Sequence, residues 1–254
     1  DERHPLSLGA GSSATTLPAR RWLQESDVLF AVGSSMTRTS YGQPIPNGKV
    51  IIHNVESIED INKDFSVDVG LPGDAKLTLQ ALIGEVKGQI GEGGRTGQIG
   101  VAKEIAELRK GWMDEWTPLL NSDEVPIGAY RVIGELERVL DKENSVVTHD
   151  AGAPRDSIIP FYTATTPHSY IGWGKTTHLG YGIPLMIGAK LADPTKFCLN
   201  FMGDGAFGMS GLDIETAVRA GAPITTVVLH NGGMATYPGG YPTANELFGL
   251  THMG

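Results

Sequence analysis

The amino-acid sequence predicts an α/β protein with two doubly wound domains, each built on a parallel sheet. Short apolar runs of strand length, such as "DVLFAVG" at 27–33 and "KVIIHNV" at 49–55, have the continuous hydrophobicity of buried parallel strands. Segments with helical spacing alternate with these runs, and this alternation is typical of an α/β sheet. A glycine-rich stretch at 84–100 holds seven glycines and predicts an exposed linker between two such sets.

The first domain is expected at 1–90 and has a Rossmann-like order of elements. A short helix is expected at 17–24, ahead of the two strands just named. The segment "SVDVGLPGDAKLTLQALIGEV" at 66–86 then predicts a strand, a turn and a helix.

A linker and connecting helix are expected at 91–120, where "VAKEIAELRKGWMDEWTPLL" has helical spacing. The second domain follows at 121–254. Its expected elements are a helix at 126–140, a strand at 145–150, a helix at 182–192, a strand at 196–202, a helix at 211–220 and a strand at 224–230.

The composition excludes several classes of protein. Apolar residues make up 40% of the chain and charged residues 19%, which indicates a soluble globular protein. The net charge of −9 disfavours a nucleic-acid partner, which requires clustered Lys and Arg. No apolar stretch has the length of a membrane helix, and the single cysteine, Cys198, cannot form an internal disulfide. We therefore expect neither nucleic acid nor membrane as a partner, and a cytoplasmic location.

Two glycine-flanked polar residues follow consecutive strands of the second domain. Asp204 lies between Gly203 and Gly205, and Asn231 follows the next strand along the chain. Parallel strands joined by one helix bring their carboxyl ends to the same edge of the sheet, where ligands bind. Carboxylate, amide and carbonyl oxygens suit Mg²⁺, and glycines let the backbone approach a phosphate closely. The pair predicts a magnesium–diphosphate site, whereas either motif alone indicates only a turn or a loop.

The spacing of these motifs resembles a known cofactor signature. Gly203-Asp204-Gly205, followed after 24 residues by His230-Asn231, is similar to the Gly-Asp-Gly … Asn-Asn signature of thiamine-diphosphate enzymes. The stretch "HLGYGIPLMIGAKLADPTKFCLNFMGDGAF" at 178–207 resembles the acetolactate synthases, 2-hydroxyacyl-CoA lyases and decarboxylases of that superfamily. The stretch "SDVLFAVGSSMTRTSYGQPIPNGKVIIHNV" at 26–55 resembles the central domain of the same superfamily.

The resemblance assigns roles to individual residues. It implies that Asp204, Asn231 and the carbonyl of Gly233 bind Mg²⁺, and that Leu179 supports the bent cofactor from below. His230 replaces the first asparagine of the signature, which is not a metal ligand of the family. The resemblance also implies that the backbone near Thr177 meets the aminopyrimidine and that Gly205 and Ala206 offer amides to the diphosphate. The remaining cofactor-binding residues that it implies are His178, Gly203 and Met234.

The resemblance also implies parts that this sequence does not supply. In this superfamily a glutamate of a pyrimidine-binding domain, usually from a partner subunit, activates the cofactor. No carboxylate between Asp1 and Gly254 can be assigned that role, so we expect a fragment that is inactive by itself. The complete protein is expected to be a homodimer or homotetramer.

The reaction class is expected to be formation or cleavage of a carbon–carbon bond next to a carbonyl, as in acetolactate synthase. The substrate would then be a 2-oxo acid. A 2-hydroxyacyl-CoA lyase or oxalyl-CoA decarboxylase is an alternative, and a non-catalytic nucleotide- or diphosphate-binding module is another. FAD or ADP is a further candidate ligand of the first domain. However, "SSMTRTSYG" at 34–42 stands where acetolactate synthases carry the Arg-Phe-Asp-Asp-Arg-like stretch associated with flavin.

Overall fold

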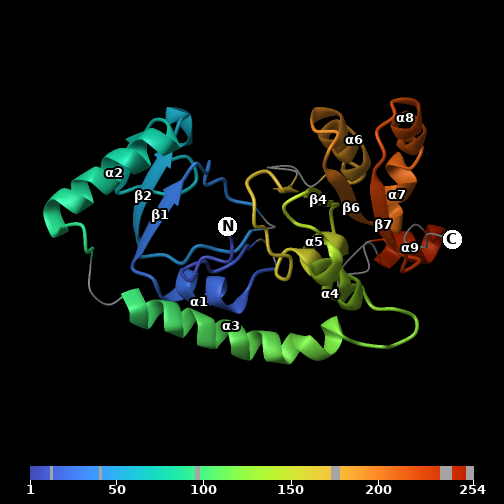
Figure 1. The fold of residues 1–254 in the computed structure, drawn as a ribbon, viewed down its shortest axis with the longest axis horizontal. Coiled ribbons are helices and arrows are strands. Elements are labelled where there is room, and N and C mark those ends of the chain that lie inside the picture. The colour runs from blue at the N-terminus through green and yellow to red at the C-terminus, as the bar shows by residue number, and fades with distance from the viewer. Residues whose placement is uncertain (12–13, 40–41, 95–97, 173–177, 235–241, 250–254) are drawn as a thin grey trace. The chain divides into compact units, whose positions relative to one another are not determined.

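The computed structural model describes residues 1–11, 14–39, 42–94, 98–172, 178–234 and 242–249. The chain divides into two compact units, one at Pro5–Asp114 and the other comprising Asp1–His4 and Glu115–Gly254. Each unit contains a parallel sheet with helices (Figure 1), which confirms the predicted α/β class.

The unit at Pro5–Asp114 has a three-stranded sheet of order β1-β2-β3, in which every pairing is parallel. Apolar residues of high β propensity dominate the first two strands, and the register sets Val28 opposite Val50. The strands are β1 (Val28–Val32), β2 (Val50–Val55) and β3 (Val69–Pro72).

The helices of this unit begin at identifiable capping residues. Helix α1 (Leu17–Glu25) begins after Thr16, whose side chain accepts from the Ala19 amide. Helix α2 (Ala75–Ile90) begins after Asp74, whose carboxylate accepts from the Leu77 amide at 2.8 Å. A short 3₁₀ turn, η1 (Ile58–Asp60), follows β2.

The predicted linker at 84–100 is wrong at 84–90 and at 98–100, where the structure has helix. Helix α2 continues through Gly84 and Gly88 and ends at Ile90, with Gly91 at its C-cap in the left-handed region (φ 79°). A glycine in a helix interior costs only about 1 kcal/mol, and strong helix formers around both glycines, among them Leu82, Glu85 and Lys87, favour continuation of the helix. The next helix, α3 (Gln98–Leu120), runs from one unit into the other.

The second unit has a four-stranded parallel sheet of order β5-β4-β6-β7. Each strand except the very short β5 was predicted. The strands are β4 (Ser145–His149), β5 (Tyr170–Ile171), β6 (Phe197–Gly203) and β7 (Thr225–Leu229). The helices that follow α3 are α4 (Ala129–Val139), α5 (Ala153–Ile158), α6 (Gly182–Ala192), α7 (Asp204–Ser210), α8 (Asp213–Arg219) and α9 (Pro242–Phe248).

The helix predicted at 211–220 is in fact the second of two short helices. Helix α7 starts at Asp204, directly after β6, and α8 covers Asp213–Arg219. Burial explains the difference, because Ala206 of α7 packs into the core while three glycines between 205 and 211 had favoured a turn. The core cluster that holds α6, β6, α7 and α8 together consists of Ile183, Ile187, Met202, Ala206, Ala217 and Ala222.

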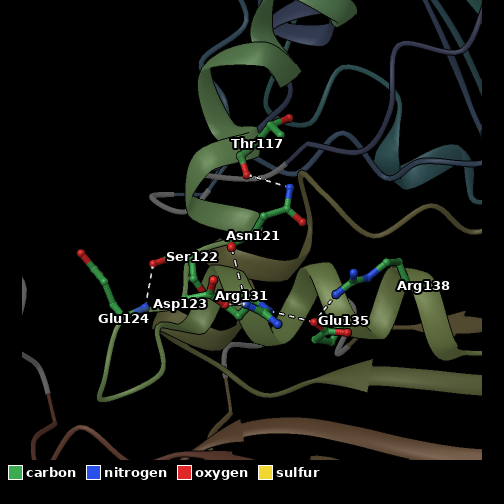
Figure 2. Close-up of polar contacts among 8 residues, drawn as sticks. All are labelled: Thr117, Asn121, Ser122, Asp123, Glu124, Arg131, Glu135 and Arg138. Carbon is green, nitrogen blue, oxygen red and sulfur yellow. Dashed lines mark hydrogen bonds and ion pairs between the residues drawn. The ribbon is translucent and has the colours of Figure 1, made fainter.

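The end of α3 is joined to α4 by aromatic and polar contacts. Trp116 lies 5.0 Å from both Tyr130 and Phe161, measured between ring centroids. Figure 2 shows Arg131 of α4 beside the α3–α4 connection, where its Nη1 donates to the Ser122 carbonyl and to Asp123 Oδ1, both at 2.8 Å. These contacts hold the end of α3, from Trp116 on, and the connection after it against α4 within the second unit.

Candidate functional site

The register of β6 and β7 brings the two predicted motifs together. Gly203 pairs with Leu229, so the residues that follow them, Asp204 and His230, emerge side by side at the carboxyl edge of the sheet. His230 Nδ1 lies 3.1 Å from Asp204 Oδ2. The predicted meeting of the two strand ends is therefore present in the structure.

Asp204 is held by backbone amides as well as by His230. Its Oδ1 accepts from the Gly205 amide and its Oδ2 from the Gly232 amide, each at 2.8 Å. Partial burial by itself raises the pKa of the Asp204 carboxyl, but the bonds from Gly205, Gly232 and His230 outweigh it and hold that pKa below its usual range. The side chain is 12% exposed, so the ionised carboxylate is largely shielded from solvent.

Asn231 lies between the two residues that bind Asp204. Its own side chain is exposed, and its Oδ1 accepts from the Gly233 amide at 3.1 Å. The amide oxygen of Asn231 and the carbonyl of Gly233 thus belong to the same short loop that contacts the carboxylate. This set of oxygen donors, one of them ionised, has the chemistry that Mg²⁺ requires.

The described residues contain no group of three or more His, Cys, Asp or Glu that could hold a metal ion. The predicted magnesium ligands comprise one carboxylate, one amide and one carbonyl, and would not form such a group. The residues present therefore fit a magnesium ion that completes its coordination with phosphate oxygens and water.

The residues predicted to line the diphosphate lie close to Asp204. A Cβ at Gly205 would lie 3.2 Å from Met234 Sδ, so the glycine and the methionine are in close contact. A Cβ at Gly203 would lie 3.7 Å from Pro154 Cγ, which places the start of α5 beside the same strand end. Ala206 is buried, with only 2% of its surface exposed.

The predicted support for the cofactor, Leu179, is partly buried. Leu179 packs against the core cluster that contains Ala206. His178, immediately before it, is exposed. Thr177, which was predicted to lie near the aminopyrimidine, falls outside the described residues.

Sequence analysis missed one residue at this edge. Asp150, the residue after β4, is completely buried, and its carboxylate accepts from the amides of Ala151, Gly180 and Gly182 at 2.8, 3.0 and 3.1 Å. A polar residue at the end of a predicted strand was the available signal. The three amide donors explain how an acidic side chain is tolerated without exposure.

Comparison with known proteins agrees with this geometry. Residues 150–247 match the family model of the thiamine pyrophosphate enzyme C-terminal TPP-binding domain, and residues 1–82 match that of the central domain. The chain is 28% identical over 242 residues to a probable acetolactate synthase large subunit of Methanococcus aeolicus, covering 91% of this chain and 40% of that protein.

Two further relatives show comparable similarity. A sulfoacetaldehyde acetyltransferase of Alcaligenes xylosoxydans xylosoxydans is 28% identical over 253 residues, covering 90% of this chain and 42% of the relative. The mitochondrial acetolactate synthase catalytic subunit of Saccharomyces cerevisiae is 27% identical over 258 residues, covering 93% and 35%. The chain thus spans about two fifths of the length of the relatives it matches.

The fold and the candidate site define a parallel α/β protein with a carboxylate, an amide and glycine-rich backbone gathered at the carboxyl edge of a sheet. Both family models match in the expected order along the chain. The chain belongs to the thiamine pyrophosphate enzyme family, which confirms the resemblance seen in the sequence. Among the described residues, no helix combines the length and hydrophobicity needed to cross a bilayer.

Proposed function

We propose that this chain is part of a thiamine-diphosphate- and Mg²⁺-dependent enzyme that makes or breaks a carbon–carbon bond next to a carbonyl. One observation carries the proposal. The ionised Asp204 carboxylate, bonded to the amides of Gly205 and Gly232, lies at a strand end within the segment that matches the TPP-binding domain. Its neighbours supply the other oxygen donors that a metal–diphosphate pair needs.

Each residue of the site has a distinct proposed role. Asp204, Asn231 and the Gly233 carbonyl would bind Mg²⁺. Leu179, already packed against the core, would support the thiazolium side of the bent cofactor. The remaining residues proposed to line the cofactor are Thr177, His178, Gly203, Gly205, Ala206 and Met234.

When bound, thiamine diphosphate supplies the electron sink next to the substrate carbonyl. The contribution of this chain is to bind and orient the diphosphate end and to hold an ionised metal ligand in place. The glutamate that starts the chemistry is proposed to come from outside residues 1–254, by analogy with the family. This chain alone would then be inactive, and the complete protein would be a cytoplasmic homodimer or homotetramer.

The relatives favour an acetolactate synthase-like carboligation of a 2-oxo acid, because acetolactate synthases recur among them and an acetyltransferase is also present. A 2-hydroxyacyl-CoA lyase-like reaction remains an alternative prediction, as does binding without catalysis. The proposed ligand of the first unit, FAD or ADP, also stays a prediction.

Calorimetric titration of the intact protein with thiamine diphosphate at saturating Mg²⁺ tests the proposal. Asp204→Asn keeps the size of the side chain but removes the charge that attracts the cation. We expect its affinity for the cofactor to fall at least about tenfold. Chelation of Mg²⁺ should have the same effect on the wild-type protein.

Glu215→Gln is the matched control. Glu215 is an exposed acid of α8 that pairs with Arg219, so its neutralisation changes the net charge equally without touching the strand ends. Its affinity should equal that of the wild type. Wild-type protein that does not bind thiamine diphosphate, or Asp204→Asn that binds it equally well, would contradict the proposal.

A further inference from the structure

The carboxylate of Asp150 joins two segments that are distant in the sequence. Strand β4 lies inside the sheet between β5 and β6, and Asp150 follows its last residue. Oδ1 of Asp150 accepts from the amides of Ala151 (2.8 Å) and Gly180 (3.0 Å), and Oδ2 accepts from the Gly182 amide (3.1 Å). One side chain thus fixes the turn that leads into α6 against the end of β4.

A carboxylate suits this position better than its amide counterpart. All three groups that face it are N–H donors, and both oxygens of a carboxylate accept hydrogen bonds. An asparagine would direct its own N–H groups at one of these donors, leaving a backbone amide without an acceptor. Since Asp150 is completely buried, water cannot replace the lost bond.

Tyr181 provides a second tie between the same two segments. Its hydroxyl donates to the His149 carbonyl and lies 3.1 Å from Thr148 Oγ1. Residues 180, 181 and 182 are therefore each bonded to the last residues of β4 or to Asp150. The turn is therefore held at three consecutive positions by one strand end, which limits its freedom to shift.

The turn is also constrained on its other sides. Gly180 adopts φ +83°, and a Cβ there would lie 3.3 Å from both Met209 and Ser210 of α7. A Cβ at Gly182 would lie 2.1 Å from the Asn200 side chain of β6. The residue that precedes this fixed turn is Leu179, which packs against the core cluster containing Ala206.

We propose that Asp150 is a positioning residue for the cofactor. By fixing the turn at 180–182, it holds Leu179 at the place where the bent thiamine diphosphate must be supported, although Asp150 itself touches only backbone amides. This inference rests on the proposed function. It separates the site into two parts, a diphosphate part built on Asp204 and Asn231, and a support part built on Leu179 and held by Asp150.

The two parts can be distinguished with two ligands. Inorganic pyrophosphate with Mg²⁺ needs only the diphosphate part, whereas thiamine diphosphate with Mg²⁺ needs both. For Asp150→Asn in the intact protein, we expect calorimetry to show affinity for thiamine diphosphate reduced about tenfold. The affinity for pyrophosphate should stay within a factor of about two of the wild type, since the contacts of Asp204 are unchanged.

Glu137→Gln is the matched control for the loss of a loop-binding carboxylate. Glu137 Oε1 accepts from the Thr163 amide at 2.9 Å, so its neutralisation also weakens a tie to a loop, but not to the turn at 180–182. Both affinities of this variant should equal those of the wild type. Circular dichroism and melting of each variant would confirm that the compared proteins are folded.

Either of two results would overturn the role of Asp150. Asp150→Asn that binds both ligands as the wild type does would show that the turn needs no carboxylate. Equal losses for both ligands would show a structural role without specificity for the support part. A wild-type protein that binds neither ligand would instead contradict the proposed function, and the inference would fall with it.

If Asp150→Asn does not fold, Gly180→Ala provides a second test. Alanine is strained at φ +83°, so the turn should move while the Asp150 carboxylate is kept. The same selective loss of thiamine diphosphate affinity is expected. Wild-type affinity for thiamine diphosphate in this variant would overturn the proposal.

Discussion

Gly134 marks the point where α4 passes against the end of α3. A Cβ built on Gly134 would lie 2.3 Å from the Leu120 carbonyl oxygen, about 1 Å short of ordinary van der Waals contact. The neighbour is a backbone atom, so it cannot move aside by rotation of a side chain. We expect Gly134→Ala to destabilise the second unit.

Two opposing effects set the size of this change. Replacement of glycine by alanine inside a helix favours folding by about 1 kcal/mol. Overpacking of a well-packed contact costs about 1–3 kcal/mol. Because the Leu120 carbonyl belongs to the end of a long helix, we take the cost of the clash as about 2 kcal/mol, which leaves Gly134→Ala less stable than the wild type by about 1 kcal/mol.

Gly188 supplies the internal control, because it lies in α6 of the same unit with no atom within 4 Å of a built Cβ. Gly188→Ala should therefore stabilise the unit by about 1 kcal/mol. The two variants should differ by about 2 kcal/mol, or roughly 6 °C in melting temperature, in urea and thermal unfolding followed by circular dichroism. Equal melting temperatures for the two variants would refute the predicted clash.

Three further predictions follow from buried or paired groups. Burial lowers the pKa of His149 to about 4, so as pH falls from 6.5 towards 4 the unfolded state takes up a proton that the folded state refuses. The difference in proton uptake lowers the free energy of unfolding by up to about 3 kcal/mol at pH 4. His149→Asn lacks this group, so urea unfolding at pH 7 and at pH 4.5 should show a smaller loss of stability for the variant than for the wild type. Hydrogen bonds to Asp123 and Glu135 raise the pKa of Arg131 and tie it to the segment before α4. Arg131→Gln should therefore speed amide hydrogen exchange at 121–125. Unchanged exchange would show that these contacts are dispensable. Cys198 is 1% exposed, and burial raises the pKa of its thiol. A disulfide reagent at pH 8 should therefore label the folded protein far more slowly than the urea-unfolded protein. Equal labelling rates would contradict the burial of Cys198.

Much of the candidate site was predictable because its signals are local. Asp204 and Asn231 each follow an apolar run of strand length, and the geometry of parallel strands brings such positions to one edge. The structure brings the two strand ends together, as predicted, and places Asp204 in hydrogen-bond contact with the two residues flanking Asn231.

Other features could not be read from local pattern. The start of α7 at Asp204 depends on the burial of Ala206 against residues of α6 and α8, which overrides the turn preference of the surrounding glycines. The contact between His230 and Asp204 depends on the register of β6 and β7, and nothing in either motif specifies that register.

Sequence alone determined the α/β class, most of the strands, and the acidic and amide residues at the strand ends, because hydrophobic periodicity and glycine placement are properties of neighbouring residues. Only the tertiary structure revealed Asp150, since its three amide donors come from position 151 and from a turn thirty residues later. Whether a buried carboxylate is stable depends on which donors the folded chain brings to it. That condition is met in space between segments far apart in the sequence, and a one-dimensional pattern cannot show it.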